Sequence, residues 1–152
     1  MKNDMECEND AEKARLLVIN EELLDDVSQR AKESPRLRMN FNLHESLDAK
    51  AQRLLNALEP GTVLPVHRHK ATAETYVLLR GRLKVILFGD DGNQVDSVVL
   101  DNETGVHGVN IPKNSWHSVE VLETETVILE VKDGPYTPLT PDNVLEIVTD
   151  KG

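Results

Sequence analysis

Short runs in which apolar and polar residues alternate recur along most of this chain, and this pattern limits the possible folds more than any other feature. In the first run, at residues 36–44, every second residue is Leu, Met or Phe and the residues between them are polar. Such alternation is typical of a half-buried β-strand. Further strand-like runs are predicted at 52–58, 63–69, 74–79, 82–88, 95–100, 106–111, 115–121 and 127–131.

Turn-forming residues separate these runs, at Pro60-Gly61, Arg80-Gly81, 89–93 and 112–114. No helical pattern lies between them, so a parallel sheet with crossover helices is not expected. About eight strands with short connections predict an all-β fold, either an antiparallel sandwich or a closed barrel of the jelly-roll kind.

Short helices are predicted to flank the strands. Asn20 is a suitable helix N-cap, acidic residues follow it, and the apolar stripe ends before Ser34-Pro35. Near the C-terminus, Thr140 followed by Pro141 predicts a second short helix that extends to about residue 148.

The chain is expected to form a single domain. Residues 1–14 are an acidic leader that we expect to be flexible. Residues 15–50 form a helix and strand that pack on a barrel of residues 51–136, and residues 137–152 form a C-terminal tail.

Composition excludes several functional classes. The net charge of -10 opposes binding to nucleic acid or to an anionic membrane. No apolar run is long enough for a membrane span, the N-terminus does not resemble a secretory signal, and Cys7 is the only cysteine. These features predict a cytoplasmic protein.

Four residues form a predicted metal site. His67 and His69 are two residues apart on a predicted strand and so share a face, while Glu74 begins the next strand and His117 lies on a later one. A His-x-His pair alone is as consistent with a surface without function as with a metal site. The glutamate, the third histidine and the turn glycines favour a divalent transition metal, which could be Zn, Fe, Mn, Ni or Co.

The segment 61–81 resembles the first motif of the cupin family. That motif is Gly, five residues, His-x-His, three or four residues, Glu, six residues, Gly. It is filled at every fixed position, by Gly61, His67, His69, Glu74 and Gly81. The resemblance implies a double-stranded β-helix.

The second cupin motif is less complete in this chain. Gly105, Pro112 and the metal-binding His117 are present, although six residues separate the first two where the family has five. Asn114 replaces the usual Gly and Val121 replaces the final Asn. Asn also tolerates the left-handed conformation that this turn requires.

Further segments, at 38–44, 67–69, 79–82 and 131–136, make residues 16–136 similar to the WbuC-type cupin fold metalloproteins. That family is associated with bacterial O-antigen and surface-polysaccharide gene clusters. The resemblance therefore implies a metal-binding cupin that acts on a sugar or nucleotide sugar. It also implies a homodimer, in which the strand at 36–44 is a candidate for crossing between subunits.

Several other polar residues are candidates for ligand binding. Arg38, Asn40, Asn42 and His44 share one face of the first strand, which either lines the cavity or faces solvent. Tyr76 should share the inward face of Glu74 and either binds the ligand or packs at the rim.

Three further features have simpler explanations. Trp116 should point away from the site because it precedes His117 on a strand, and His107 is expected at the surface. The acidic turn at 90–93 resembles part of a calcium loop, but a hairpin explains it. Cys7 has no expected catalytic role.

Two classes of function remain open. The first is a metal-dependent enzyme, either an isomerase or epimerase of sugars or an Fe(II) dioxygenase, with Glu74 as a metal ligand and possible base. The second is a non-catalytic protein that binds or senses a small ligand through the metal. A metal-free sugar epimerase would leave three converging histidines without a purpose.

Overall fold

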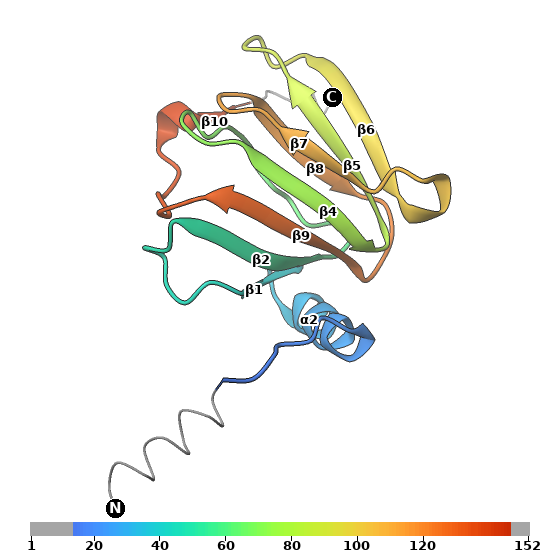
Figure 1. Ribbon diagram of the computed structural model, residues 1–152. Coiled ribbons are helices and arrows are strands. Elements are labelled where there is room, and N and C mark those ends of the chain that lie inside the picture. The colour runs from blue at the N-terminus through green and yellow to red at the C-terminus, as the bar shows by residue number, and fades with distance from the viewer. Residues whose placement is uncertain (1–13, 147–152) are drawn as a thin grey trace, which may run out of the picture.

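The computed structural model describes residues 14–146, and these form two five-stranded antiparallel sheets and one α-helix (Figure 1). The helix is α2 (Glu21–Glu33). The strands are β1 (Arg38–Asn42), β2 (Ala51–Leu58), β3 (Val66–His67), β4 (Glu74–Arg80), β5 (Arg82–Phe88), β6 (Gln94–Asp101), β7 (Gly108–Ile111), β8 (Trp116–Val121), β9 (Thr126–Asp133) and β10 (Val144–Leu145).

The strand order is β1-β2-β9-β4-β7 in the first sheet and β10-β3-β8-β5-β6 in the second. All pairings between these strands are antiparallel. The predicted all-β class is therefore confirmed, and each strand-like run of the sequence contains a strand. The run at 63–69 is much shorter than predicted, because only Val66–His67 pairs as a strand.

A hydrophobic core lies between the two sheets, and it follows the alternation of the sequence. Its buried members come from strands of both sheets, and they are Leu58, Tyr76, Leu78, Leu83, Val85, Leu100, Ile111 and Ile128. Because side chains alternate between the faces of a strand, the polar residues at alternate positions of the first sheet reach the same interior. This interior is where the predicted metal site lies.

Helix α2 packs on the outer face of the first sheet. The Asn20 side chain accepts a hydrogen bond from Leu23 N at 3.0 Å, and the helix ends at Glu33, as predicted. Its buried stripe contacts β2 and β9 in a second core that contains Leu24, Val27, Ala31, Leu55, Ala57 and Val127.

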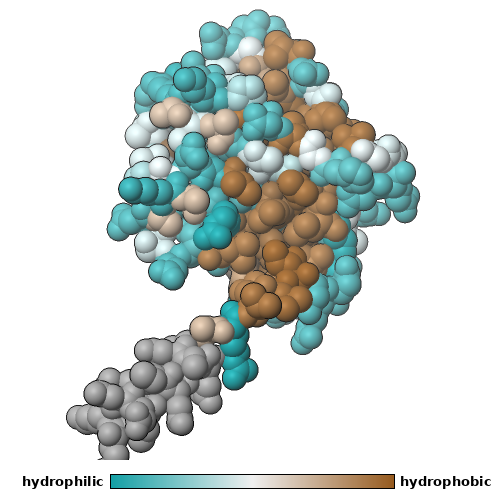
Figure 2. Space-filling model, viewed as in Figure 1, coloured by the Kyte–Doolittle hydropathy of each residue, from teal (hydrophilic) through white to brown (hydrophobic). Residues whose placement is uncertain are grey.

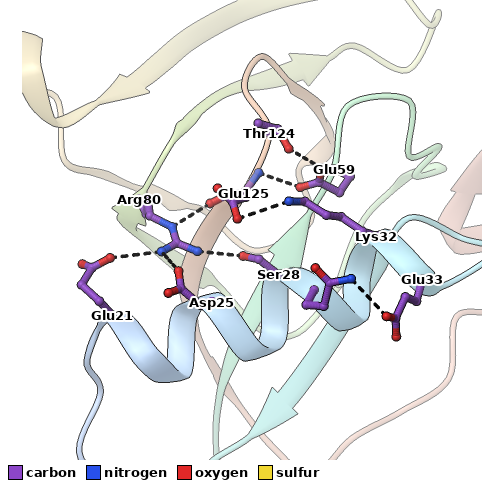
Figure 3. A network of polar contacts seen from close by, with 10 residues as sticks. Glu21, Asp25, Ser28, Lys32, Glu33, Glu59, Arg80, Thr124 and Glu125 are labelled. Carbon is purple, nitrogen blue, oxygen red and sulfur yellow. Dashed lines mark hydrogen bonds and ion pairs between the residues drawn. The ribbon is translucent and has the colours of Figure 1, made fainter.

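Arg80, at the end of β4, also holds this helix in place (Figure 3). Its guanidinium donates to Asp25 at 2.7 Å, to Glu21 at 3.1 Å and to the buried Ser28 hydroxyl at 3.0 Å, all on α2. It also donates to the Glu125 carbonyl at 3.1 Å. One side chain therefore connects the helix, β4 and the turn before β9.

Gly81 occupies the tight β4–β5 connection. Its φ is +90°, and a Cβ at this position would lie 2.7 Å from the Thr126 Cα. Both the backbone conformation and the close approach of β9 therefore require glycine. Asn114 has a φ of +64°, so the expectation that asparagine adopts the left-handed conformation there is confirmed.

The predicted C-terminal helix is wrong over the described residues. Pro141–Asn143 form a single 3-10 turn, and Val144–Leu145 then pair with β3 as strand β10. Pairing satisfies the free backbone edge of β3, so tertiary contacts override the local helix signal.

The acidic leader (all but its last residue), Cys7 and the end of the predicted C-terminal helix lie outside the described residues. Within the described part of the chain, the helix is not long and apolar enough to cross a membrane.

Candidate metal centre

The four predicted ligands come together between the two sheets. His67 is the last residue of β3 and pairs with His117 of β8 in the second sheet, while Glu74 begins β4 in the first sheet. One ligand atom from each of His67, His69, Glu74 and His117 lies within 4.8 Å of the others. We call these residues the His–Glu cluster.

The Glu74 carboxylate is the centre of the cluster. Its Oε1 lies 3.0 Å from His69 Nε2, and its Oε2 lies 3.1 Å from His117 Nε2. The buried Tyr76 hydroxyl donates to Oε2 at 2.9 Å, and Lys132 Nζ lies 3.8 Å from Oε1. Tyr76 thus shares the inward face with Glu74, as its spacing predicts, and it orients the carboxylate.

Backbone carbonyls orient two of the imidazoles. His67 Nδ1 lies 2.9 Å from the Pro65 carbonyl, and His117 Nδ1 lies 2.8 Å from the Ser115 carbonyl. A carbonyl only accepts, so each Nδ1 carries a hydrogen and each Nε2 is available as a ligand. Metal-bound histidines are oriented in this way by their second nitrogen.

The surroundings of His117 are suited to a cation. Its Nδ1 faces the Ser115 carbonyl, and its Nε2 faces the Glu74 carboxylate, so both nitrogens face acceptors. A neutral imidazole has only one N–H. This arrangement therefore needs either a second proton or a metal ion between Nε2 and Glu74.

The electrostatics also favour a metal ion. Burial alone would raise the pKa of Glu74, but hydrogen bonds from His117 and His69 hold that pKa well below its usual range. Burial, assisted by the nearby His117, lowers the pKa of His67 to about 4. An ionised carboxylate and a neutral imidazole are the forms that bind a divalent transition metal.

A cavity of about 490 Å³ adjoins the His–Glu cluster, and we call it the central cavity. His67, His69 and Glu74 line one part of it, and Arg38 and Asn40 line another. These two residues of β1 are thus brought to the same cavity as the predicted metal ligands.

The other two candidates from the first strand do not line this cavity. Asn42 is exposed at the end of β1, and His44 is buried, with its Nδ1 at hydrogen-bonding distance from the Arg53 backbone. Alternation placed all four residues on one face, but the cavity extends along only part of that face.

Three polar residues on β2 and β9 that line the cavity beside the His–Glu cluster were not singled out from the sequence. They are Asn56 on β2 and Glu130 and Lys132 on β9. Burial, followed by the charge of Glu74, raises the pKa of Glu130 to about 7. The sequence offered one signal for Glu130 and Lys132. These two charged residues alternate along the strand and share a face with the apolar Ile128.

The remaining candidates lie outside the centre. Trp116 donates to Asp90 at 2.8 Å and stacks under the Arg68 guanidinium, so it points away from the His–Glu cluster and fixes the acidic turn. His107 is exposed and lies 2.7 Å from the Asn102 side chain. Asp90 lies in the turn between the paired strands β5 and β6, so this hairpin accounts for the acidic residue.

Solved structures with a similar fold are cupin-domain proteins. KdgF from Halomonas sp. is 15% identical with a TM-score of 0.53, over 68% of this chain and 84% of that one. The cupin-2 protein Rru_A2000 from Rhodospirillum rubrum is 16% identical with a TM-score of 0.52, over 73% and 72%. The predicted cupin barrel is therefore confirmed as a fold.

A third similar structure is that of CapF, a capsular polysaccharide assembling protein from Staphylococcus aureus. It is 17% identical with a TM-score of 0.56, and the match covers 72% of this chain but only 33% of CapF. No curated protein matches the chain. The family described as a domain of unknown function (DUF6016) matches residues 19–100, which is more than half of the chain. The chain therefore belongs to the DUF6016 family and folds as a cupin.

Proposed function

We propose that this protein is a small metal-dependent enzyme that binds one divalent transition metal through the His–Glu cluster and acts on a sugar or nucleotide sugar. The observation that carries the proposal is the convergence of four ligand atoms within 4.8 Å of one another beside a cavity. A bound metal with open positions would polarise a carbonyl or hydroxyl group of the ligand.

The wall of the cavity supplies the groups that such chemistry needs. Glu130 can hold or release a proton near neutral pH, because its pKa is raised to about 7. Glu74 serves as a ligand and not as the base, since its two oxygens face His69, His117 and Tyr76 and its pKa is held low. Tyr76 fixes the orientation of that carboxylate.

The first test is the metal content of the purified protein after expression with added metal salts. The wild-type chain should retain about one ion, whereas His67→Ala and His117→Ala should lose at least the roughly 10- to 100-fold in metal affinity that the loss of a group supporting a ligand costs. The variant His107→Ala removes an exposed histidine outside the cluster and should keep the ion. A wild-type protein that is folded but binds no transition metal would overturn the proposal.

A non-catalytic binding protein is the second candidate. It is favoured by the many contacts to Glu74, which leave this carboxylate unavailable as a base. A turnover screen with nucleotide sugars separates the two candidates. Turnover that is lost in His67→Ala supports the enzyme, and saturable binding without turnover supports the binding protein.

The proposal of a particular type of enzyme is based on the sequence motifs. The similarity to WbuC-type cupins supports a role in surface-polysaccharide metabolism, and a sugar isomerase or epimerase suits that role. CapF is described as assembling capsular polysaccharide, but its likeness to this chain is one of fold. A dioxygenase is the other version, and it requires iron as the bound metal and consumption of oxygen with the substrate.

A further inference from the structure

The central cavity has two chemically different ends. The His–Glu cluster lies at one end, where Glu74 of β4 pairs with Lys132 of β9. At the other end, Arg38 pairs with Leu58, which in turn pairs with Thr126 of β9. Thr126 and Lys132 are six residues apart on β9. The row of paired residues that contains Arg38 therefore lies about 20 Å along the strand direction from the row that contains Glu74.

Two arginines without an acidic partner mark the second end. Arg36 and Arg38 both line the cavity, and no ion pair links either of them to an acidic side chain among residues 14–146. The chain as a whole carries a net charge of -10, so acidic partners are abundant. Two neighbouring guanidinium groups whose donors are not used by an acidic side chain are suited to binding an anionic ligand.

The Arg38 guanidinium is also held in position. Its Nη1 donates to the Val63 carbonyl at 3.0 Å and lies 3.4 Å from the Thr62 hydroxyl. These contacts use one terminal nitrogen, and within the described residues its other nitrogens donate to no protein acceptor. Burial, followed by repulsion from Arg36, lowers the pKa of Arg38.

Asn56 supplies an independent indication of a ligand between the two ends. It lines the cavity, is only 8% exposed, and donates through Nδ2 to Glu130 at 3.0 Å. Its Oδ1 is buried and has no hydrogen-bond partner within the described residues. Buried acceptors are almost always paired, so this oxygen is suited to a hydroxyl donor from a bound ligand.

We propose that the central cavity binds an extended, hydroxylated organic anion. Its phosphate or carboxylate lies against Arg36 and Arg38, a hydroxyl donates to Asn56 Oδ1, and its far end reaches the His–Glu cluster. This inference rests on the proposed function for the metal-bound end only. It narrows the substrate class from sugars in general to charged sugar derivatives, because a neutral sugar would leave the arginines unpaired.

Calorimetric titration of the metal-loaded protein with four probes tests this inference. UDP-glucose and glucose 6-phosphate carry phosphate, glucuronate carries a carboxylate, and glucose is the neutral reference. At least one anion should bind ten or more times as tightly as glucose. The anion that binds most tightly then identifies the source of the negative charge.

The variant Arg38→Gln tests the position of the anion. Gln is polar but uncharged and too short to reach the Val63 carbonyl; because that contact is exposed, thermal stability should change little while the affinity for the anion falls at least tenfold. The affinity for glucose should stay the same. The matched control Arg82→Gln removes one positive charge at an exposed position outside the cavity and should change neither affinity by more than twofold.

Outcomes for the metal and for the anion are separable because metal content is measured in the same samples. Absence of metal would count against the proposed function. If metal is bound, equal affinities for glucose and the three anions would overturn the inference, and so would an undiminished affinity in Arg38→Gln. Failure of all three anions to bind would overturn it as well.

Discussion

The fold raises the pKa of Glu130 into the neutral range, so the protonation state of this carboxyl group changes near pH 7. Burial and the charge of Glu74 raise its pKa from 4.5 to about 7. Because the folded-state pKa is the higher one, its favourable contribution is complete below pH 4.5 and is lost as the pH rises through 7. In metal-free protein this loss should amount to about 3 kcal/mol at most.

The variant Glu130→Gln cannot ionise, so its unfolding free energy should fall less than that of the wild type between pH 4.5 and 7.5. Denaturant unfolding at a series of pH values, with a chelator present, measures this difference. The exposed Glu103→Gln should behave as the wild type does. Parallel curves for Glu130→Gln and the wild type would show that Glu130 ionises normally.

Tyr76→Phe tests the positioning of the central carboxylate. The substitution removes only the buried hydroxyl that donates to Glu74 at 2.9 Å, so the carboxylate loses one of the contacts that orient it. Partners of this kind typically contribute about 10- to 100-fold to metal affinity. Competition with a chromophoric chelator should show a loss in this range, whereas Tyr136→Phe, at an exposed position of the same cavity, should show none. An unchanged affinity in Tyr76→Phe would mean that the histidines alone orient Glu74.

Single residues also show how far sequence reasoning reaches. The His–Glu cluster could be named in advance, because His67, His69 and Glu74 are close in sequence and belong to one motif. Asn56 and Glu130 meet only through the pairing of β2 with β9, and no local pattern encodes that pairing. Alternation assigns His44 and Arg38 to one face but does not say where the cavity ends.

Among the elements, helix α2 is docked to the sheet by its apolar stripe and also by the polar contacts of Arg80. Arg80→Met should lower the unfolding free energy by about 1–3 kcal/mol, because the buried Ser28 hydroxyl loses its donor. The exposed ion pairs to Glu21 and Asp25 should add little. Most of the loss should therefore persist in high salt.

Denaturant unfolding at low and high salt measures this effect. Lys32→Met provides the comparison, since it breaks only an exposed ion pair to Glu125, which also connects the helix with the turn before β9. Its loss should stay below about 1 kcal/mol and disappear in high salt. An Arg80→Met variant that regains full stability in high salt would show that the exposed pairs dominate.

The elements were predictable where the local signal and the tertiary contacts agree. The alternating runs became strands, and Asn20 and Pro35 bracket a helix whose stripe is buried. The predictions were wrong in the length of β3 and in the helix expected near the C-terminus. Thr140 and Pro141 are a good helix start, but Val144–Leu145 pair with β3, which would otherwise present a free edge beside His67.

At the scale of the whole molecule, the described residues expose many large apolar side chains. Figure 2 shows hydrophobic residues over the middle of the view, reaching down toward helix α2. The apolar segment 16–19 before this helix belongs to no helix or strand and is exposed, with Leu16 at 94% and Val18 at 62%. β1 is also an edge strand of the first sheet. Such surfaces commonly mark contacts between subunits.

We therefore expect a homodimer, in which segment 16–19 is buried against a second copy. Sedimentation velocity should give twice the chain mass of 17.0 kDa at micromolar concentrations. The double variant Leu17→Asp with Val18→Asp places charge in this segment and should sediment as a folded monomer. Val95→Asp changes an equally apolar, exposed position on β6 and should remain dimeric. A monomeric wild type would refute the prediction. A dimeric double variant would refute the role of segment 16–19, and the edge of β1, where a second copy could add a strand, would be the next contact to test.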